Sequence, residues 1–178
     1  MNTNLIALRT LSAGVVLAAC LSAPALGGDV QRHGESYVIY LPPTLPFNEV
    51  VDRVQTEILA QNWDVVNVQD LGIGLRKLGV WTENRIIQAC QSQYLKQAMR
   101  KDPFITLIIP CRFTVFREHV LATDPGGEYE AKPSRIVVGF ADPVSEAKAV
   151  GLTQVDEAQA AAEELKEVLV RVADFYKP

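Results

Sequence analysis

The sequence predicts an α+β fold, a two-layer sandwich in which helices cover one face of a mixed or antiparallel sheet. Short β-rich segments alternate with amphipathic helical segments along much of the chain. Consecutive β segments then follow without a crossover helix, which argues against a doubly wound parallel sheet. The length of 178 residues fits a single domain over residues 30–178.

Residues 1–25 have the composition of a signal peptide. The run from Thr10 to Ser22 is apolar or small, and a small-residue cleavage site ends at Ala25. The run is too short for a spanning helix, which needs about 20 residues. The residues before Cys20 also resemble a lipobox, in which residues 1–19 are removed and Cys20 is lipidated. The first reading predicts a periplasmic or secreted protein, and the alternative predicts a membrane-anchored lipoprotein.

The first half of the mature chain alternates strands with amphipathic helices. Between residues 47 and 62, apolar Val50, Val54 and Ile58 recur every three to four residues, with charged residues on the other side. The predicted elements are strands over Tyr37 to Leu41, Trp63 to Val68 and Arg85 to Cys90, and helices over Phe47 to Asn62, Leu71 to Leu78 (ended by Gly79) and Ser92 to Arg100.

The second half is predicted to begin with strands and to end in a long helix. The predicted elements are strands over Phe104 to Ile109, Arg112 to Leu121 and Arg135 to Phe140, a turn at Asp124-Pro125-Gly126-Gly127, and a helix over residues 156–176. Alternation predicts that Leu107, Ile109, Cys111, Phe113 and Val115 face the helices, with Thr106, Arg112 and Thr114 on the other side. Residues 142–154 lack periodicity and are predicted to be a flexible connection.

Charge and missing motifs exclude several classes of function. The 17 Lys and Arg stand against 21 Asp and Glu, and no basic run occurs, which argues against binding to nucleic acid or anionic lipid. His33 and His119 are the only histidines, so one chain cannot supply a three-histidine zinc site. The sequence has no familiar hydrolase or metalloprotease motif. We therefore expect no catalytic residue, no metal ligand and no cofactor, and we favour a non-enzyme.

Two further local patterns have structural explanations. Gly72-Ile73-Gly74 follows a strand, but it lacks the third glycine and the lysine of phosphate-binding loops, so it predicts a tight turn. Glu163, Glu164 and Glu167 are predicted to lie on the solvent side of the last helix rather than to form a catalytic pair.

Cys90 and Cys111 are the cysteines that remain if Cys20 is removed or lipidated. Cys90 ends a predicted strand, and Cys111 follows Pro110 at the start of another. Three outcomes stay open for them: independent buried residues, a structural disulfide, and a reactive or metal-binding thiol pair. A C-x-x-C spacing would be a strong redox signal, whereas the 20 residues between these cysteines make it a weak one, because nothing local forces the sulfurs together.

The surroundings of these cysteines resemble the domain of unknown function 302 family. The resemblance is carried by Cys90, then Tyr94, Leu95, Ala98 and Met99, then Asp102-Pro103, then Leu107-Ile108-Ile109-Pro110-Cys111-Arg112, and it spans residues 47–143. Family members often have a proline shortly after the first cysteine, whereas Gln91-Ser92-Gln93 follows here. The resemblance implies a compact α+β domain, often exported or envelope-associated, with no agreed activity.

Two functional hypotheses follow. The first is a non-enzymatic accessory module of the cell envelope that binds a small molecule or a partner protein on its sheet face or in a helix cleft. The alternative is a thiol-based redox or metal-carrying protein that uses Cys90 and Cys111. We expect no transmembrane span, and a homo-oligomer and a lipid anchor at Cys20 are open alternatives.

Overall fold

The computed structural model describes residues 29–123 and 129–177. The predicted signal segment with Cys20 and the predicted turn at residues 124–127 lie outside them. Within the described residues, six strands form one sheet in the order β1-β2-β6-β5-β4-β3, and every neighbouring pair is antiparallel. The strands are β1 (Gln31–His33), β2 (Ser36–Leu41), β3 (Asp64–Asp70), β4 (Asn84–Cys90), β5 (Cys111–Thr123) and β6 (Tyr129–Ala141).

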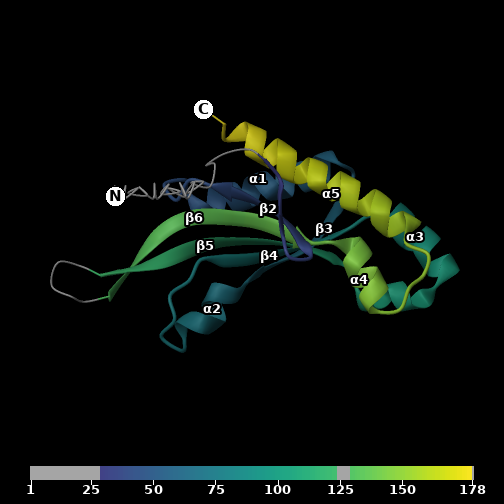
Figure 1. Cartoon of the computed structure of the whole chain (residues 1–178), viewed down its shortest axis with the longest axis horizontal. Coiled ribbons are helices and arrows are strands. Elements are labelled where there is room, and N and C mark those ends of the chain that lie inside the picture. Colours follow the sequence, from purple (N-terminus) through teal and green to yellow (C-terminus); the bar gives the residue numbers. More distant parts are fainter. Residues whose placement is uncertain (1–28, 124–128, 178) are drawn as a thin grey trace, which may run out of the picture.

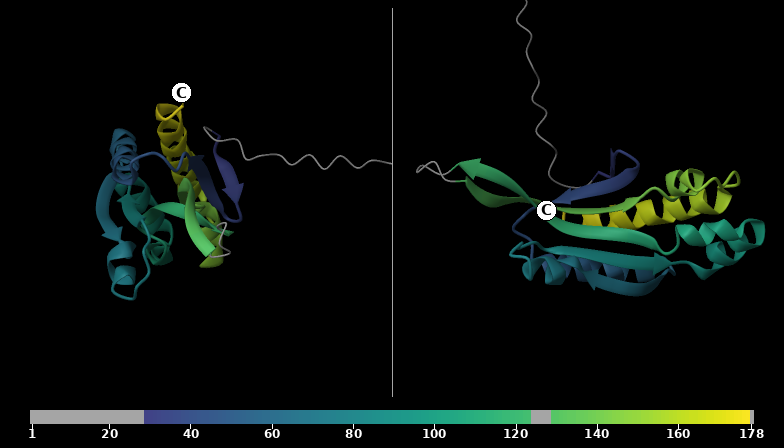
Figure 2. Two further views of the ribbon diagram at one scale, coloured as in Figure 1. Left: turned by 90° about the vertical axis from the view of Figure 1, so that its left-hand side faces the viewer. Right: turned by 90° about the horizontal axis from the view of Figure 1, so that it is seen from below.

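The two long helices, α1 (Phe47–Ala60) and α5 (Asp156–Phe175), cover one face of this sheet. The shorter helices are α2 (Leu71–Arg76), α3 (Ser92–Lys101), the 3-10 helix η1 (Pro103–Leu107) and α4 (Pro143–Ala149). Figure 1 shows α1 and α5 on one side of the sheet and the short α2 on the other side. Figure 2 shows the same two-layer arrangement from the end and from below. The predicted α+β fold is confirmed, and its two long helices share one face as predicted, whereas the short α2 lies on the other (Figure 1).

The core lies between the sheet and the two long helices. Strand residues alternate, so that Ile39, Phe113, Val115 and Val138 point toward the helices and are almost fully buried. From α1 and α5 the core receives Val50, Val54, Ile58, Leu165, Leu169 and Val172. Helix α1 ends just before Asn62, which has a φ of 59°, a left-handed conformation that asparagine tolerates. No helix among the described residues combines the length and apolarity that crossing a bilayer requires.

The prediction of a strand over Phe104 to Ile109 is wrong. Asp102 accepts a hydrogen bond from the backbone N–H of Phe104 at 2.9 Å, and Pro103 occupies the first helical turn of η1. Ile105 is buried against Ala98, Ala147, Leu152 and Ala158, in a small cluster that joins α3, η1, α4 and α5. Packing into this cluster overrides the β propensity of the segment. Leu107, predicted to face inward, is 67% exposed.

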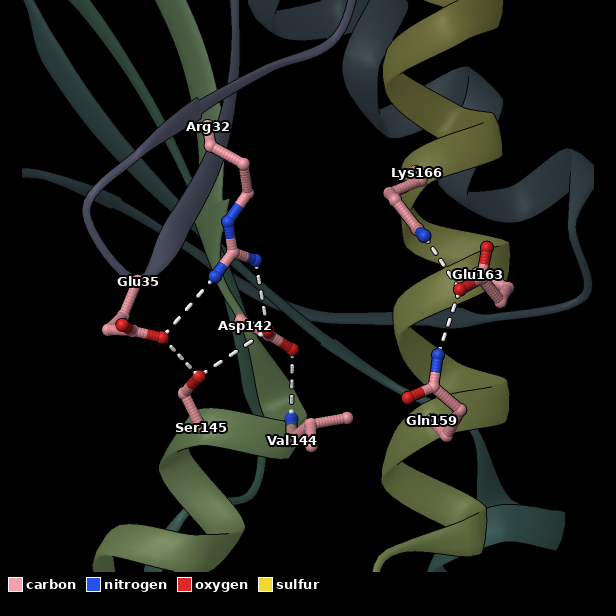
Figure 3. Close-up of polar contacts among 8 residues, drawn as sticks. All are labelled: Arg32, Glu35, Asp142, Val144, Ser145, Gln159, Glu163 and Lys166. Carbon is pink, nitrogen blue, oxygen red and sulfur yellow. Dashed lines mark hydrogen bonds and ion pairs between the residues drawn. The ribbon is translucent and has the colours of Figure 1, made fainter.

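The prediction that residues 142–154 form a flexible connection is also wrong. Asp142 accepts a hydrogen bond from the backbone N–H of Val144 at 3.0 Å and thereby caps α4. The same buried carboxylate accepts a hydrogen bond from Arg32 at 3.0 Å and another from Ser145 (Figure 3). Arg32 also pairs with Glu35, so the first hairpin is fastened to the start of α4.

Candidate functional site

Among the described residues, the sheet face opposite α1 and α5 carries a hollow. Alternation places Val38 and Tyr40 of β2, and Thr114 and Phe116 of β5, on this face. Together with their neighbours they line a hollow of about 420 Å³, which we call the sheet-face hollow. Its lining residues are His33, Ser36, Val38, Tyr40, Ile86, Arg112, Thr114, Phe116, Glu118, Arg135, Val137, Gly139, Phe140 and Ala141.

Strand register explains the shape of the sheet-face hollow. Val38 lies opposite Gly139, Gly139 lies opposite Thr114, and Thr114 lies opposite Ile86, so these four form one row across the sheet. Glycine leaves this row without a side chain on β6. A Cβ at Gly139 would lie 2.7 Å from the carbonyl oxygen of Tyr37 and from Cγ1 of Val38, so no larger residue fits without a shift.

The floor of the sheet-face hollow is apolar. The next row contains Tyr40, Val137 and Phe116, which are register partners on β2, β6 and β5. Val137 is only 3% exposed although it faces away from the helical layer. An antiparallel sheet with one free face normally carries polar side chains on that face. The apolar floor is therefore a feature that the fold itself does not require.

Charged groups lie at the two ends of the sheet-face hollow. Arg112 donates a hydrogen bond to Glu146 of α4 at 2.9 Å. At the other end, Glu118 accepts two hydrogen bonds from Arg135 and one from Ser134, and the Arg135 guanidinium carbon lies 3.8 Å from the centre of the Tyr40 ring. Hydrogen bonding by Arg135 lowers the pKa of Glu118 below its usual value.

The two cysteines lie at a different and much smaller cavity. This thiol crevice, of about 40 Å³, is lined by Trp63, Cys90, Tyr94, Cys111, Ala158 and neighbouring residues of α3, η1 and α5. Its volume holds little more than ordered water and lies far below the range of small-molecule sites, about 300–1,000 Å³.

Both thiols are free in the structure. Cys111 lies opposite Ala89 in the register, so Cys90, one residue further along β4, belongs to the opposite face of the sheet. Burial is the main cause that raises the pKa of Cys111 to about 12, with smaller contributions from Glu146 and Cys90. Burial also raises the pKa of Cys90. Both shifts favour the protonated thiol, which is a poor nucleophile and a poor metal ligand.

A carboxylate that the sequence assigned to solvent lies beside the thiol crevice. Glu164 of α5 accepts a hydrogen bond from Trp63 Nε1 at 2.7 Å and another from the Tyr94 hydroxyl at 2.6 Å. The prediction that Glu164 lies on the solvent side of the last helix is therefore wrong. The hydrogen bond to Glu164 is the main cause that raises the pKa of Tyr94 to about 12.

The other two glutamates of that predicted group are exposed and paired within α5. Glu163 accepts hydrogen bonds from Gln159 and Lys166 (Figure 3), and Glu167 accepts one from Arg171. These pairs follow the spacing of helix neighbours.

The remaining predicted candidates are dispersed. His33 and His119 are both exposed, and His33 lies at the margin of the sheet-face hollow. Gly72 and Gly74 lie within the six-residue α2, where a Cβ on Gly72 would come within 2.5 Å of the Thr82 carbonyl oxygen. Among the described residues, no three of the His, Cys, Asp and Glu side chains are grouped as metal ligands.

Comparison with known proteins agrees with the fold and the motifs around the cysteines. The model of the family described as "Domain of unknown function DUF302" matches residues 39–125. Residues 39–125 therefore match this family, as the resemblance at Cys90 and Cys111 predicted.

A solved structure of an uncharacterized conserved protein of this family from Bacillus stearothermophilus has the same fold. It superposes with a TM-score of 0.60 at 14% sequence identity, and the match covers 82% of this chain and 100% of the other. No curated protein matches the chain.

Sequence reasoning named the sheet face as one possible binding surface and predicted that Arg112 and Thr114 point away from the helices, but it did not find the sheet-face hollow. The residues that escaped notice are its floor, Val38, Tyr40, Phe116 and Val137. A signal for them exists in β6, where Ile136, Val137 and Val138 form a continuous apolar run rather than an alternating one.

Proposed function

We propose that this domain is a non-enzymatic binding protein that holds a small molecule in the sheet-face hollow. The observation that carries the proposal is the apolar floor on the sheet face opposite α1 and α5, where Val38 and Val137 are buried. The volume of about 420 Å³ lies within the range of small-molecule sites. The predicted signal peptide supports a site of action outside the cytoplasm, where the domain would serve as an accessory module of the envelope.

A thiol-based function receives less support. Cys90 and Cys111 are near each other at the thiol crevice, but burial keeps both protonated and their register places them on opposite faces. Redox and metal-carrying cysteines are usually accessible and have lowered pKa values. The cysteines are better explained as packing residues of the family fold.

The proposal is tested by filling the sheet-face hollow. The probe is the neutral apolar dye N-phenyl-1-naphthylamine, followed by ¹⁵N NMR of the wild-type protein and of Thr114→Phe. In the wild type we expect the dye to shift the amide signals of Thr114, Gly139 and Ile86. Thr114→Phe places a ring beside Gly139, in a strand where phenylalanine is well tolerated, and should abolish dye binding there.

The matched control is Thr56→Phe, the same change on the exposed surface of α1, which should leave dye binding intact. Dye-induced shifts confined to other surfaces, or equal binding by Thr114→Phe and the wild type, would contradict the proposal.

A further inference from the structure

We infer that the ligand of the sheet-face hollow is an amphipathic anion, with its anionic group at Arg112 and its apolar body on the row of Tyr40, Val137 and Phe116. This inference rests on the proposed function and specifies the chemical class of the ligand. It follows from the unequal use of hydrogen-bonding groups at the two ends of the hollow.

At one end the charges are already satisfied. The carboxylate of Glu118 receives three hydrogen bonds, two from Arg135 and one from Ser134. Arg135 in turn is held against Glu118 by two nitrogens and lies over the Tyr40 ring. Arg135 meets both oxygens of Glu118 through two nitrogens and is 26% exposed, whereas Arg112 meets Glu146 through one nitrogen. The Arg135–Glu118 pair is therefore the more completely neutralised of the two, and it borders the apolar body of the ligand rather than its head group.

At the other end donors are in excess. An arginine carries five N–H groups, and among the described residues only Glu146 accepts a hydrogen bond from Arg112. The Arg112 side chain is 53% exposed and lines the sheet-face hollow. The hydroxyl of Ser36, whose register partner on β6 is Ala141, also lines the hollow. A planar guanidinium with free N–H groups is suited to a carboxylate or phosphate group.

The apolar row lies within reach of this charge along the strands. Arg112, Thr114 and Phe116 alternate along β5 on the same face, so about 6–7 Å separates successive side chains. An anionic group at Arg112 therefore leaves an attached chain of several carbons to run over Thr114 and Gly139 onto Phe116 and Val137. The missing side chain at Gly139 gives this path its room.

The inference is tested with three eight-carbon probes that differ only in the head group: octanoate, octan-1-ol and octylammonium. Binding is measured as ¹⁵N NMR titrations that follow the amides of Thr114, Gly139 and Phe116. We expect octanoate to bind about tenfold or more tightly than octanol, because a charge-assisted hydrogen bond contributes on that scale. Octylammonium should bind most weakly.

Three variants locate the charge. Arg112→Gln should remove the preference for octanoate over octanol. Glu146→Gln frees Arg112 from its present partner and should tighten octanoate binding without changing octanol binding, an effect that a merely structural role would not produce. The control is Arg171→Gln, which removes an arginine of similar exposure (50%) and similar pairing on α5 and should change neither.

The outcomes separate the two proposals. If octanol or octylammonium binds the hollow as tightly as octanoate, or if Arg112→Gln keeps the preference for octanoate, the ligand class is wrong while the binding site stands. If none of the probes shifts the amides of the hollow, and the dye also fails there, the proposed function itself is refuted.

Discussion

The packing of α5 on the sheet can be tested by comparing two leucines. Leu165 of α5 is 0% exposed and belongs to the core cluster between α1, α5 and the sheet, whereas Leu107 of η1 is 67% exposed. Leucine-to-alanine substitution at a fully buried site costs about 2.7–5.0 kcal/mol, the sum of the lost transfer free energy and the cavity that remains. At an exposed site the change stays within about 0.5 kcal/mol.

We therefore expect Leu165→Ala to lower the free energy of unfolding by about 3 kcal/mol and Leu107→Ala to leave it almost unchanged. For a domain of this size, 3 kcal/mol corresponds to a fall in Tm of roughly 6–12 °C. Urea unfolding followed by circular dichroism gives both values, and equal m-values verify that the compared states are the same.

Two results would refute this reasoning. A near-zero effect of Leu165→Ala would mean that α5 does not close the core. If Leu107→Ala lowered the free energy of unfolding as much as Leu165→Ala, the segment around Leu107 would pack as an inner strand, as the sequence alone suggested, and not as η1.

Two further predictions concern titrating groups. Burial raises the pKa of Cys111 to about 12, so we expect iodoacetamide at pH 8 to alkylate Cys111 roughly a hundredfold or more slowly in the folded protein than in the unfolded protein. Peptide mass spectrometry measures both rates. Rapid alkylation of Cys111 in the folded protein would favour the reactive-thiol hypothesis. Hydrogen bonding by Arg135 lowers the folded-state pKa of Glu118, so Glu118 contributes stability above about pH 4.5 that is lost as the pH falls. The difference in unfolding free energy between wild type and Glu118→Gln should therefore shrink on acidification, and a gap independent of pH would contradict this assignment.

Elements with a strong hydrophobic period were predictable from the sequence. In α1 the residues Val50, Val54 and Ile58 repeat at helical spacing because a single face meets the sheet, and the same holds for Leu165 and Leu169 in α5. In such helices, burial of one face requires apolar residues at helical spacing, so the sequence itself shows the period. Element boundaries were predicted less accurately. The first helix was predicted to reach Asn62, but it ends at Ala60, and Asn62 has a left-handed backbone conformation.

The errors arose where partners distant in the sequence decide the structure. Glu164 looks like a solvent-facing helix residue until Trp63 and Tyr94, which lie 101 and 70 residues away, donate to its two oxygens. The segment around Ile105 has strand composition, but Ala147 and Leu152 cover it from the other end of the chain. No local pattern encodes such contacts, so propensity alone could not have found them.

The sheet-face hollow is a different case, because the sequence does contain a signal for it in the continuous apolar runs of the central strands. That signal conflicted with the expected fold, in which one sheet face is free. Ile136, Val137 and Val138 are consecutive and all buried, and Val38 and Ile39 repeat the pattern on the neighbouring strand. Continuous apolar runs are typical of strands that are covered on both faces, yet α1 and α5 cover only one. The central strands of this sheet carry apolar side chains on both faces, but the long helices cover only one of them. The other face therefore presents an apolar surface that a bound molecule would cover. The strands are apolar on both faces although the long helices cover only one, and this is the physical reason for placing the ligand in the sheet-face hollow.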